Sequence, residues 1–302
     1  MHTVAYLYTI RLSRKTSKER QMIMNTHSFP WMLIPTGTRI MEQQEKDAVE
    51  QAFEGRVSET IFDIPQGSQV FTRYRSIPFG VELEKEVSAH GSKLINSYAQ
   101  HRNIANLFNW IDLLDGLTAP AYDITMIPYL KEGEYFVKGE TNSLKNSWFE
   151  KAYAPSKRSL IDVIRNVQLD TYVGEQDVVI RPFRNYRQIG KLVDNRPVFN
   201  EYRVFVLDGK IMGKGFYWSS WSVDNEVVDM ISPKEFEATL HEAIQRVKHL
   251  SRFLVIDLAE FPNGSWEVVE LNDGNMSGLS DIIPGELWTN VYQHLTAPYR
   301  RS

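Results

Sequence analysis

The chain has 302 residues, of which 42% are hydrophobic and 24% are charged. These proportions are ordinary for a globular protein and predict two or three packed subdomains. The net charge of −4 gives no basic footprint for nucleic acid, and no apolar stretch approaches the roughly 20 residues of a membrane span.

The chain contains no cysteine, which excludes disulfides, thiol catalysis and cysteine-based zinc sites. Its first residues lack the basic and apolar pattern of a signal peptide. We therefore expect a cytoplasmic protein that binds neither nucleic acid nor membrane.

The first part of the chain predicts an N-terminal α/β subdomain over residues 1–115. Residues 3–12 are expected to form a strand, and the polar residues 11–20 form either a loop or a solvated helix face. Apolar residues recur at helical spacing in three segments, residues 45–53, 79–90 and 97–114. The Asn96-Ser97 pair is typical of a helix cap before the last of them.

A central lid subdomain is predicted over residues 116–183. Its expected elements, in chain order, are a strand at 134–138, a polar loop at 139–147, a helix at 156–167 and a strand at 177–183.

A C-terminal subdomain is predicted over residues 184–302. Two pairs of strands flank the turn dipeptides Asp208-Gly209 and Asn263-Gly264. Between these hairpins, Ser232 caps a helix that is expected to run to about residue 250. The order of elements predicts an α+β fold in which an antiparallel sheet packs against helices.

The Asn263-Gly264 hairpin places two carboxylates together. A two-residue type I′ loop sets Asp257 directly opposite Glu270, and Asn272 follows on the same face. Like charges at directly opposed positions repel, so the pair favours a cation between them. Two carboxylates and an amide oxygen form the kind of ligand set that a hard divalent cation prefers.

The Asp208-Gly209 hairpin carries the opposite charge. The same counting places Arg203 opposite Lys214, and two cations on one face suit a polyphosphate. An anionic and a cationic pair in neighbouring hairpins together indicate Mg²⁺ bound with a nucleoside triphosphate. The alternative interpretation is that each like-charged pair lies on a solvated sheet face with its side chains splayed outward.

These residues resemble a known family. Asp257 with Glu270-Leu-Asn272 is similar to the metal-binding signature of ATP-grasp ligases, and residues 201–213 resemble the strand pair that precedes it. Residues 137–148 and 179–183 resemble the lysine-bearing loop and arginine-bearing strand of a divergent clade defined by one arginine and two lysines. That clade includes phage and bacterial proteins and the eukaryotic chaperone that assembles translation initiation factor two. The resemblance covers about residues 70–285.

The resemblance implies an ATP-grasp fold, with an antiparallel sheet core, a lid and an N-terminal α/β subdomain. It implies that Asp257, Glu270 and Asn272 bind Mg²⁺, and that Arg203 holds the γ-phosphate as a catalytic residue. The nucleotide-binding residues that it implies are Lys138, Lys145, Arg181, Pro182, Phe183, Arg184 and Glu201. Lys214 is also expected to be catalytic, although it has no family counterpart and depends on the hairpin register alone.

The activity that the resemblance implies is ADP-forming ligation of a carboxylate to an amine through an acylphosphate. The substrates would be small molecules, peptides or proteins. The alternative is an ATP-binding assembly factor that ligates nothing. One departure from the family pattern lies in the lid loop, where Thr141, Asn142 and Ser143 follow the single Gly139 in place of a glycine-rich sequence. Trp218 and Trp221 are expected either to line the acceptor site or to cover the end of the sheet.

Overall fold

The structure is a computed structural model that describes residues 29–34, 41–74, 80–171, 173–192, 194–221 and 229–297. The strand predicted at residues 3–12 and the polar segment at 11–20 lie outside the described residues. The chain separates into two compact units. One comprises Met1–Ile95 with Trp288–Ser302 and the other comprises Asn96–Leu287. The division into three subdomains stays a prediction.

The first unit contains a parallel sheet with strand order β2-β1-β3-β4. Its strands are β1 (Pro30–Leu33), β2 (Val57–Ser58), β3 (Gln69–Phe71) and β4 (Lys93–Leu94). Its helices are α3 (Gln43–Ala52), the 3₁₀ turn η1 (Ile61–Asp63) and α4 (Gly80–Ala89). Leu33, Val70, Leu83 and Val87 belong to its buried core. The helices predicted at 45–53 and 79–90 are confirmed within the described residues.

The single helix predicted at 97–114 is wrong. A capping box between Ser97 and Gln100 starts α5 (Tyr98–Ala105) as expected. The helix ends at Asn106, which has an extended backbone (φ −83°, ψ 117°) and accepts a hydrogen bond on its side chain from Phe108 N. This local bond competes with helical continuation. The chain continues in the 3₁₀ turns η2 (Leu107–Asn109) and η3 (Ile111–Leu114).

The lid elements pack around a small antiparallel sheet with strand order β6-β5-β7. The strands are β5 (Tyr135–Gly139), β6 (Tyr153–Ala154) and β7 (Val178–Pro182). The helix α6 (Lys157–Gln168) begins at a capping box between Ser156 and Ser159 and buries Leu160, Val163, Ile164 and Val167. The shorter turns are η4 (Ile124–Tyr129), η5 (Lys145–Ser147) and η6 (Trp148–Ala152).

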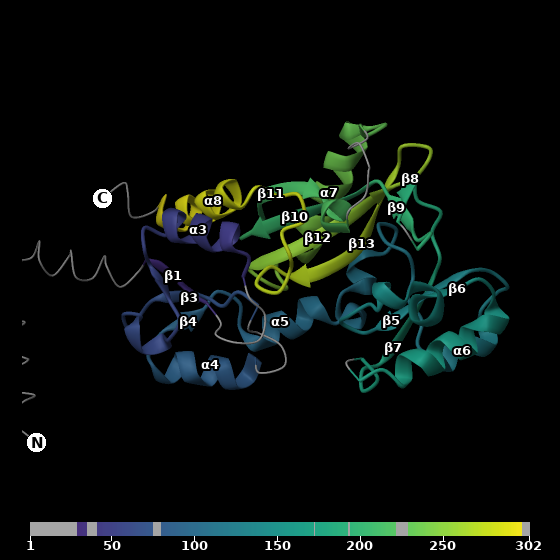
Figure 1. Ribbon diagram of the computed structural model, residues 1–302, viewed down its shortest axis with the longest axis horizontal. Helices are drawn as coiled ribbons and strands as arrows, with labels where there is room; N and C mark the ends of the chain where they lie inside the picture. The colour runs from purple at the N-terminus through teal and green to yellow at the C-terminus, as the bar shows by residue number, and fades with distance from the viewer. Residues whose placement is uncertain are drawn as a thin grey trace, which may run out of the picture. The chain divides into compact units, whose positions relative to one another are not determined.

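The larger sheet of the second unit is antiparallel, with strand order β11-β10-β12-β13 (Figure 1). Its strands are β10 (Glu201–Leu207), β11 (Lys210–Phe216), β12 (Phe253–Glu260) and β13 (Trp266–Asp273). The helix α7 (Pro233–Val247) packs its apolar side on one face of this sheet, in a core that includes Phe236, Leu240, Val204, Ile256 and Val268. The antiparallel sheet covered by a helix is therefore confirmed.

The remaining elements are the hairpin β8 (Gln188–Lys191) and β9 (Pro197–Phe199), the turn η7 (Tyr217–Trp221) and the helix α8 (Pro284–Thr296). Within the described ranges, the structure has no helix of the length and apolarity that crossing a membrane requires.

Candidate active site

The hairpin between β10 and β11 forms the predicted two-residue turn but not the predicted register. Asp208 and Gly209 both adopt positive φ (49° and 76°), as a type I′ turn requires. A bulge after Phe205 then adds Met212 to β11, so that Arg203 pairs with Gly215 and Lys214 pairs with Val204. The predicted opposition of Arg203 and Lys214 is therefore wrong, because one extra residue moves a side chain to the other face.

The physical reason for this register lies on the face that carries Arg203. A Cβ atom at Gly215 would lie 2.7 Å from the backbone nitrogen of Ile282, and one at Gly213 would lie 3.0 Å from the Ile282 side chain. The segment around Ile282 therefore crosses the sheet where only glycine leaves room. Lys214 points to the other face, where its ammonium pairs with Glu237 and lies 4.8 Å from the Phe236 ring.

The hairpin between β12 and β13 confirms that Asp257 faces Glu270, although its loop is longer than predicted. Phe261 N donates to Ser265 O, which leaves Pro262, Asn263 and Gly264 as a three-residue loop. Gly264 has φ 83°, whereas the Asn263 side chain accepts a hydrogen bond from Ser265 N at 3.0 Å. This side-chain turn fixes the longer loop.

A second bulge corrects the register. Leu258 pairs with Val268 while Asp257 pairs with Glu270, so Val269 is the extra residue of β13. Its carbonyl oxygen accepts a hydrogen bond from Arg181 Nη1 at 2.6 Å. Arg181 also donates through Nη2 to Thr118 Oγ1 at 2.6 Å and to Ala119 O at 2.7 Å. The arginine of β7 thus holds the bulge that brings Glu270 opposite Asp257.

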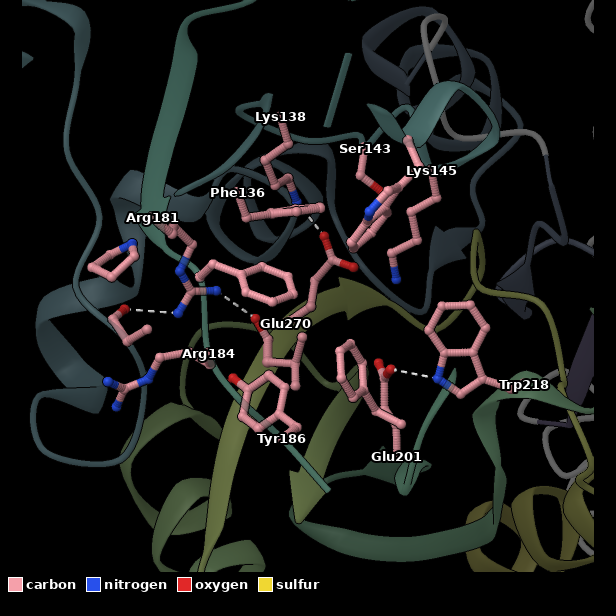
Figure 2. Close-up of a pocket in the computed structure, with 16 residues that line it drawn as sticks. Phe136, Lys138, Ser143, Lys145, Arg181, Arg184, Tyr186, Glu201, Trp218 and Glu270 are labelled. Atoms are coloured by element: carbon pink, nitrogen blue, oxygen red, sulfur yellow. Dashed lines mark hydrogen bonds and ion pairs between the residues drawn. The ribbon is translucent and has the colours of Figure 1, made fainter. Parts of the chain in front are cut away.

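Both predicted metal-binding carboxylates are paired with cations. Arg203 binds Asp257 with two bonds, Nε–Oδ1 at 2.9 Å and Nη2–Oδ2 at 2.7 Å, and the Asp257 side chain is 1% exposed. Lys138 of β5 forms an ion pair with Glu270, which Figure 2 shows as a dashed line. Burial raises the pKa of Glu270, but Lys138 and Lys145 outweigh it and lower that pKa to about 2.

A pocket opens beside Glu270 and encloses about 690 Å³, a volume that includes the solvent at its mouth (Figure 2). Ligand sites are commonly concave, with apolar walls and a few polar groups. The pocket is lined by Ala119, Phe136, Lys138, Ser143, Lys145, Trp148, Arg181, Pro182, Phe183, Arg184, Tyr186, Phe199, Glu201, Trp218, Val269 and Glu270. These residues come mainly from the lid strands, the segment after β7 and the larger sheet.

All seven residues expected to bind nucleotide line this pocket, together with Glu270 from the expected metal set. Asp257 and Asn272 do not line it. Asp257 is held by Arg203, and Asn272 is half-buried on β13 opposite Val255. Lys214 is directed away from it.

The sequence prediction missed most of the aromatic wall, which includes Phe136, Trp148, Tyr186 and Phe199. The aromatic content of 12% gave only a general signal of a cleft or a large core. Trp218 was expected either near the acceptor site or at the sheet end. It lines the pocket and donates through Nε1 to Glu201 Oε2 at 2.9 Å.

Glu201 and Lys145 give the pocket an electrostatic balance. Glu201 is 3% exposed, and its Oε1 has no hydrogen-bond partner among the residues that the structure describes. Burial raises the pKa of Glu201 to about 7, partly offset by Lys145, while Asp257 raises it further. Burial lowers the pKa of Lys145, but its neighbours Tyr217, Glu201 and Glu270 outweigh this effect and raise it. Lys145 therefore stays charged.

Arg181 is a further charged group on the pocket wall, and its hydrogen bonds go to three neutral oxygens. Its Nε finds no hydrogen-bond partner in the described part of the chain. Burial lowers its pKa, but the ordinary value of 12.5 leaves it charged at neutral pH. A buried cation of this kind favours an anion nearby.

Arg184 and Tyr186 are held by one carboxylate. Arg184 Nε lies 3.0 Å from Glu267 Oε1, its Nη2 also bonds Glu267, and Tyr186 Oη donates to the same Oε1 at 2.7 Å. The Phe183 amide already donates to Glu134 O at 2.9 Å. The backbone between Pro182 and Arg184 therefore has fewer free groups for a base edge than the sequence implied.

The lid loop after Gly139 uses its own polar groups. The side chain of Gln176 accepts hydrogen bonds from Thr141 N and Thr141 Oγ1, both at 3.1 Å. A Cβ atom at residue 139 would lie 2.4 Å from that Gln176 oxygen, which explains the single glycine. Asn142 is exposed, and Ser143 lines the pocket. Of the three polar residues expected to replace a glycine-rich loop, only Ser143 is in place to do so.

The described residues contain no group of three or more histidine, cysteine, aspartate or glutamate side chains arranged to hold a metal. The predicted set has two carboxylates and one amide, and Mg²⁺ uses one or two carboxylates when phosphate and water complete its shell. The donor chemistry therefore fits a metal that arrives with a polyphosphate.

Comparison with known proteins identifies the fold and the family. The family described as an ATP-grasp domain, family 3 of the clade named for one arginine and two lysines, matches residues 126–291, more than half of the chain. The chain belongs to this family. No curated protein sequence matches it.

Solved structures with the ATP-grasp fold resemble this chain at low identity. D-cycloserine synthetase DcsG has a TM-score of 0.58 at 12% identity, over 87% of this chain and 99% of that chain. D-alanine–D-alanine ligase from Bacillus anthracis, complexed with ATP, has a TM-score of 0.56 at 12% identity, over 91% and 97%. The ligase PsnB, complexed with precursor peptide PsnA2 and AMPPNP, has a TM-score of 0.54 at 12% identity, over 91% and 99%. At this identity the likeness shows the α+β ATP-grasp fold alone.

Proposed function

We propose that this ATP-grasp protein is an ATP-dependent carboxylate–amine ligase. The observation that carries the proposal is the convergence of Lys138, Lys145 and Arg181 on one aromatic-walled pocket beside Glu270. Three cations suit a triphosphate, and aromatic faces suit a purine ring. That D-alanine–D-alanine ligase and PsnB share the fold supports the same class of reaction.

The nucleotide would lie with its base against the aromatic wall near Phe183 and Phe199, and with its phosphates toward Lys138 and Lys145. Glu201 Oε1, buried and directed to the same pocket, would accept a hydroxyl of the nucleotide. Phosphate oxygens would replace Glu270 as a partner of Lys138. Asp257, Glu270 and Asn272 would then hold Mg²⁺, which neutralises charge on the phosphates when bound.

The reaction needs no nucleophilic side chain. A carboxylate oxygen of the substrate attacks the γ-phosphorus, the bond to the β-phosphate oxygen breaks, and ADP leaves. An amine then attacks the acyl carbon, phosphate leaves, and the amine loses a proton to give the amide. Arg203 and Lys138 contribute by stabilising charge on the transferred phosphoryl group.

Turnover in the presence of a pool of amino acids and peptides tests this proposal. The wild-type protein should release ADP and phosphate and give a product whose mass equals the two substrates minus water. Asp257→Asn and Glu270→Gln should lose turnover while keeping the wild-type circular dichroism spectrum. Undiminished turnover in both variants would sink the assignment of these residues.

A nucleotide-dependent binding protein is the second candidate, and the lid loop favours it. Gln176 occupies the amide of Thr141, so this loop offers fewer donors to the phosphates than a glycine-rich loop. If ATP binds tightly while no substrate pool yields ADP or a new mass, this candidate replaces the ligase. Release of ADP with formation of an amide excludes it.

A further inference from the structure

Tyr217 lies between two cations of the site. It is the first residue of η7, directly after β11. Lys145 Nζ donates to Tyr217 Oη at 3.0 Å and lies 4.5 Å from the centre of the same ring. The guanidinium carbon of Arg203 lies 4.7 Å from that ring. One aromatic side chain therefore contacts the lid lysine and the arginine of the larger sheet.

The position of Tyr217 suits a supporting role. The tyrosine is half-buried and is not among the residues that line the pocket, whereas Lys145 and its neighbour Trp218 are. Burial raises the pKa of Tyr217, although Lys145 and Arg203 oppose this, so the hydroxyl stays neutral. A neutral phenol can accept from an ammonium while its ring face attracts both cations.

The backbone of Lys145 is held as well. Arg196, in the connection between β8 and β9, donates through Nη1 to Lys145 O at 2.6 Å. Figure 2 shows the Lys145 side chain directed into the pocket from the lid. Both ends of this residue are thus fixed by groups from outside the lid sheet. A free lysine side chain has one of the largest rotamer entropies, so fixing it in advance favours a ligand that it binds.

We propose that Tyr217 is a positioning residue that holds Lys145 ready for the phosphates of the nucleotide and separates it from Arg203. The proposal rests on the proposed function. An ammonium has three donors, and the bond to Tyr217 uses one, so two remain for phosphate oxygens. The ring between Lys145 and Arg203 reduces the repulsion that two cations would otherwise exert on each other.

A fluorescent ATP analogue with Mg²⁺ measures the effect as a dissociation constant. Tyr217→Phe removes the hydroxyl and keeps the ring, so we expect binding to weaken about three- to tenfold, as for the loss of one charged hydrogen bond. Tyr217→Leu removes both and should weaken it further. Tyr135→Phe is the matched control, because Tyr135 Oη donates to Lys131 O in the lid core and does not line the pocket. It should bind as the wild type does.

A double-mutant cycle separates positioning from a general structural effect. In a Lys145→Met background, Tyr217→Phe should change the dissociation constant by less than about twofold, because the group that it positions is gone. An equal loss in both backgrounds, or wild-type affinity in Tyr217→Phe, would overturn the proposal. If the wild-type protein fails to bind the analogue, the proposed function itself fails.

Discussion

Arg203 and Asp257 form a two-bond ion pair across neighbouring strands, with both side chains buried. Arg203 Nη1 also donates to Gly278 O at 3.0 Å, so the pair ties the chain after β13 to the sheet. Removing one partner of a buried pair leaves the other charge without compensation. This pair therefore contributes to stability as well as to the proposed phosphate chemistry.

Asp257→Asn should lower the free energy of unfolding by about 3–5 kcal/mol, because Arg203 loses its counter-charge in a buried setting. Asp208→Asn is the matched control. Asp208 accepts the same two-bond pattern from Arg252, at 2.7 and 2.9 Å, but both side chains are about one-third exposed. Its loss should be within about 1 kcal/mol. Urea denaturation measures both, and equal losses would contradict the assignment of the buried pair.

Metal binding should depend on the nucleotide. Mg²⁺ alone must compete with Arg203 for Asp257 and with Lys138 for Glu270, whereas a triphosphate offers both cations new partners. We expect Mg²⁺ to bind at least about tenfold more tightly in the presence of a non-hydrolysable ATP analogue. Titration of Mn²⁺ followed by electron paramagnetic resonance tests this. The same Mn²⁺ affinity with and without the analogue would refute the coupling.

Arg181 should be needed for the geometry of β13. Arg181→Met leaves the oxygens of Val269 and Ala119 without this donor, at a cost of about 1–3 kcal/mol for each unsatisfied group. Arg181→Lys should not restore stability, because an ammonium cannot reproduce the arginine fork. Thermal unfolding followed by circular dichroism measures both. Full stability in Arg181→Lys would show that charge alone is sufficient.

The C-terminal hairpin shows how far the sequence could predict this site. The opposition of Asp257 and Glu270 is correct, but two departures cancel to produce it. The loop has three residues because the Asn263 side chain bonds Ser265, and the bulge at Val269 then restores the register. A sequence signals the turn dipeptide. It carries no comparable signal for a bulge that is held by Arg181 from another strand.

The neighbouring hairpin shows the opposite outcome. Its turn is the predicted type, yet the bulge at Met212 displaces Lys214 from the site because the Ile282 segment crosses above Gly215. That contact joins residues far apart in sequence, so local periodicity could not anticipate it. Motifs whose residues lie on single strands, such as Lys138 and Arg181, could be placed correctly.

Glu201 gives the free protein a specific pH dependence. Its folded pKa of about 7 lies above its ordinary value of 4.5, so its contribution to stability is fully present below pH 4.5 and is lost as the pH rises through about 7. The difference corresponds to on the order of 3 kcal/mol. Glu201→Gln keeps an acceptor for Trp218 and should lack this decline. Urea denaturation from about pH 4.5 to about pH 8 compares the two proteins, and parallel curves would contradict the shift.

Titration calorimetry with ATP and Mg²⁺ tests the central claim that the pocket binds the nucleotide through its cations. The wild type should bind one equivalent, and Lys138→Met should weaken binding by at least about tenfold through loss of a charged contact. Lys151→Met is the matched control, because Lys151 pairs with Asp170 and does not line the pocket. It should bind as the wild type does. Equal affinity in Lys138→Met and wild type, or no binding by the wild type, would contradict the account.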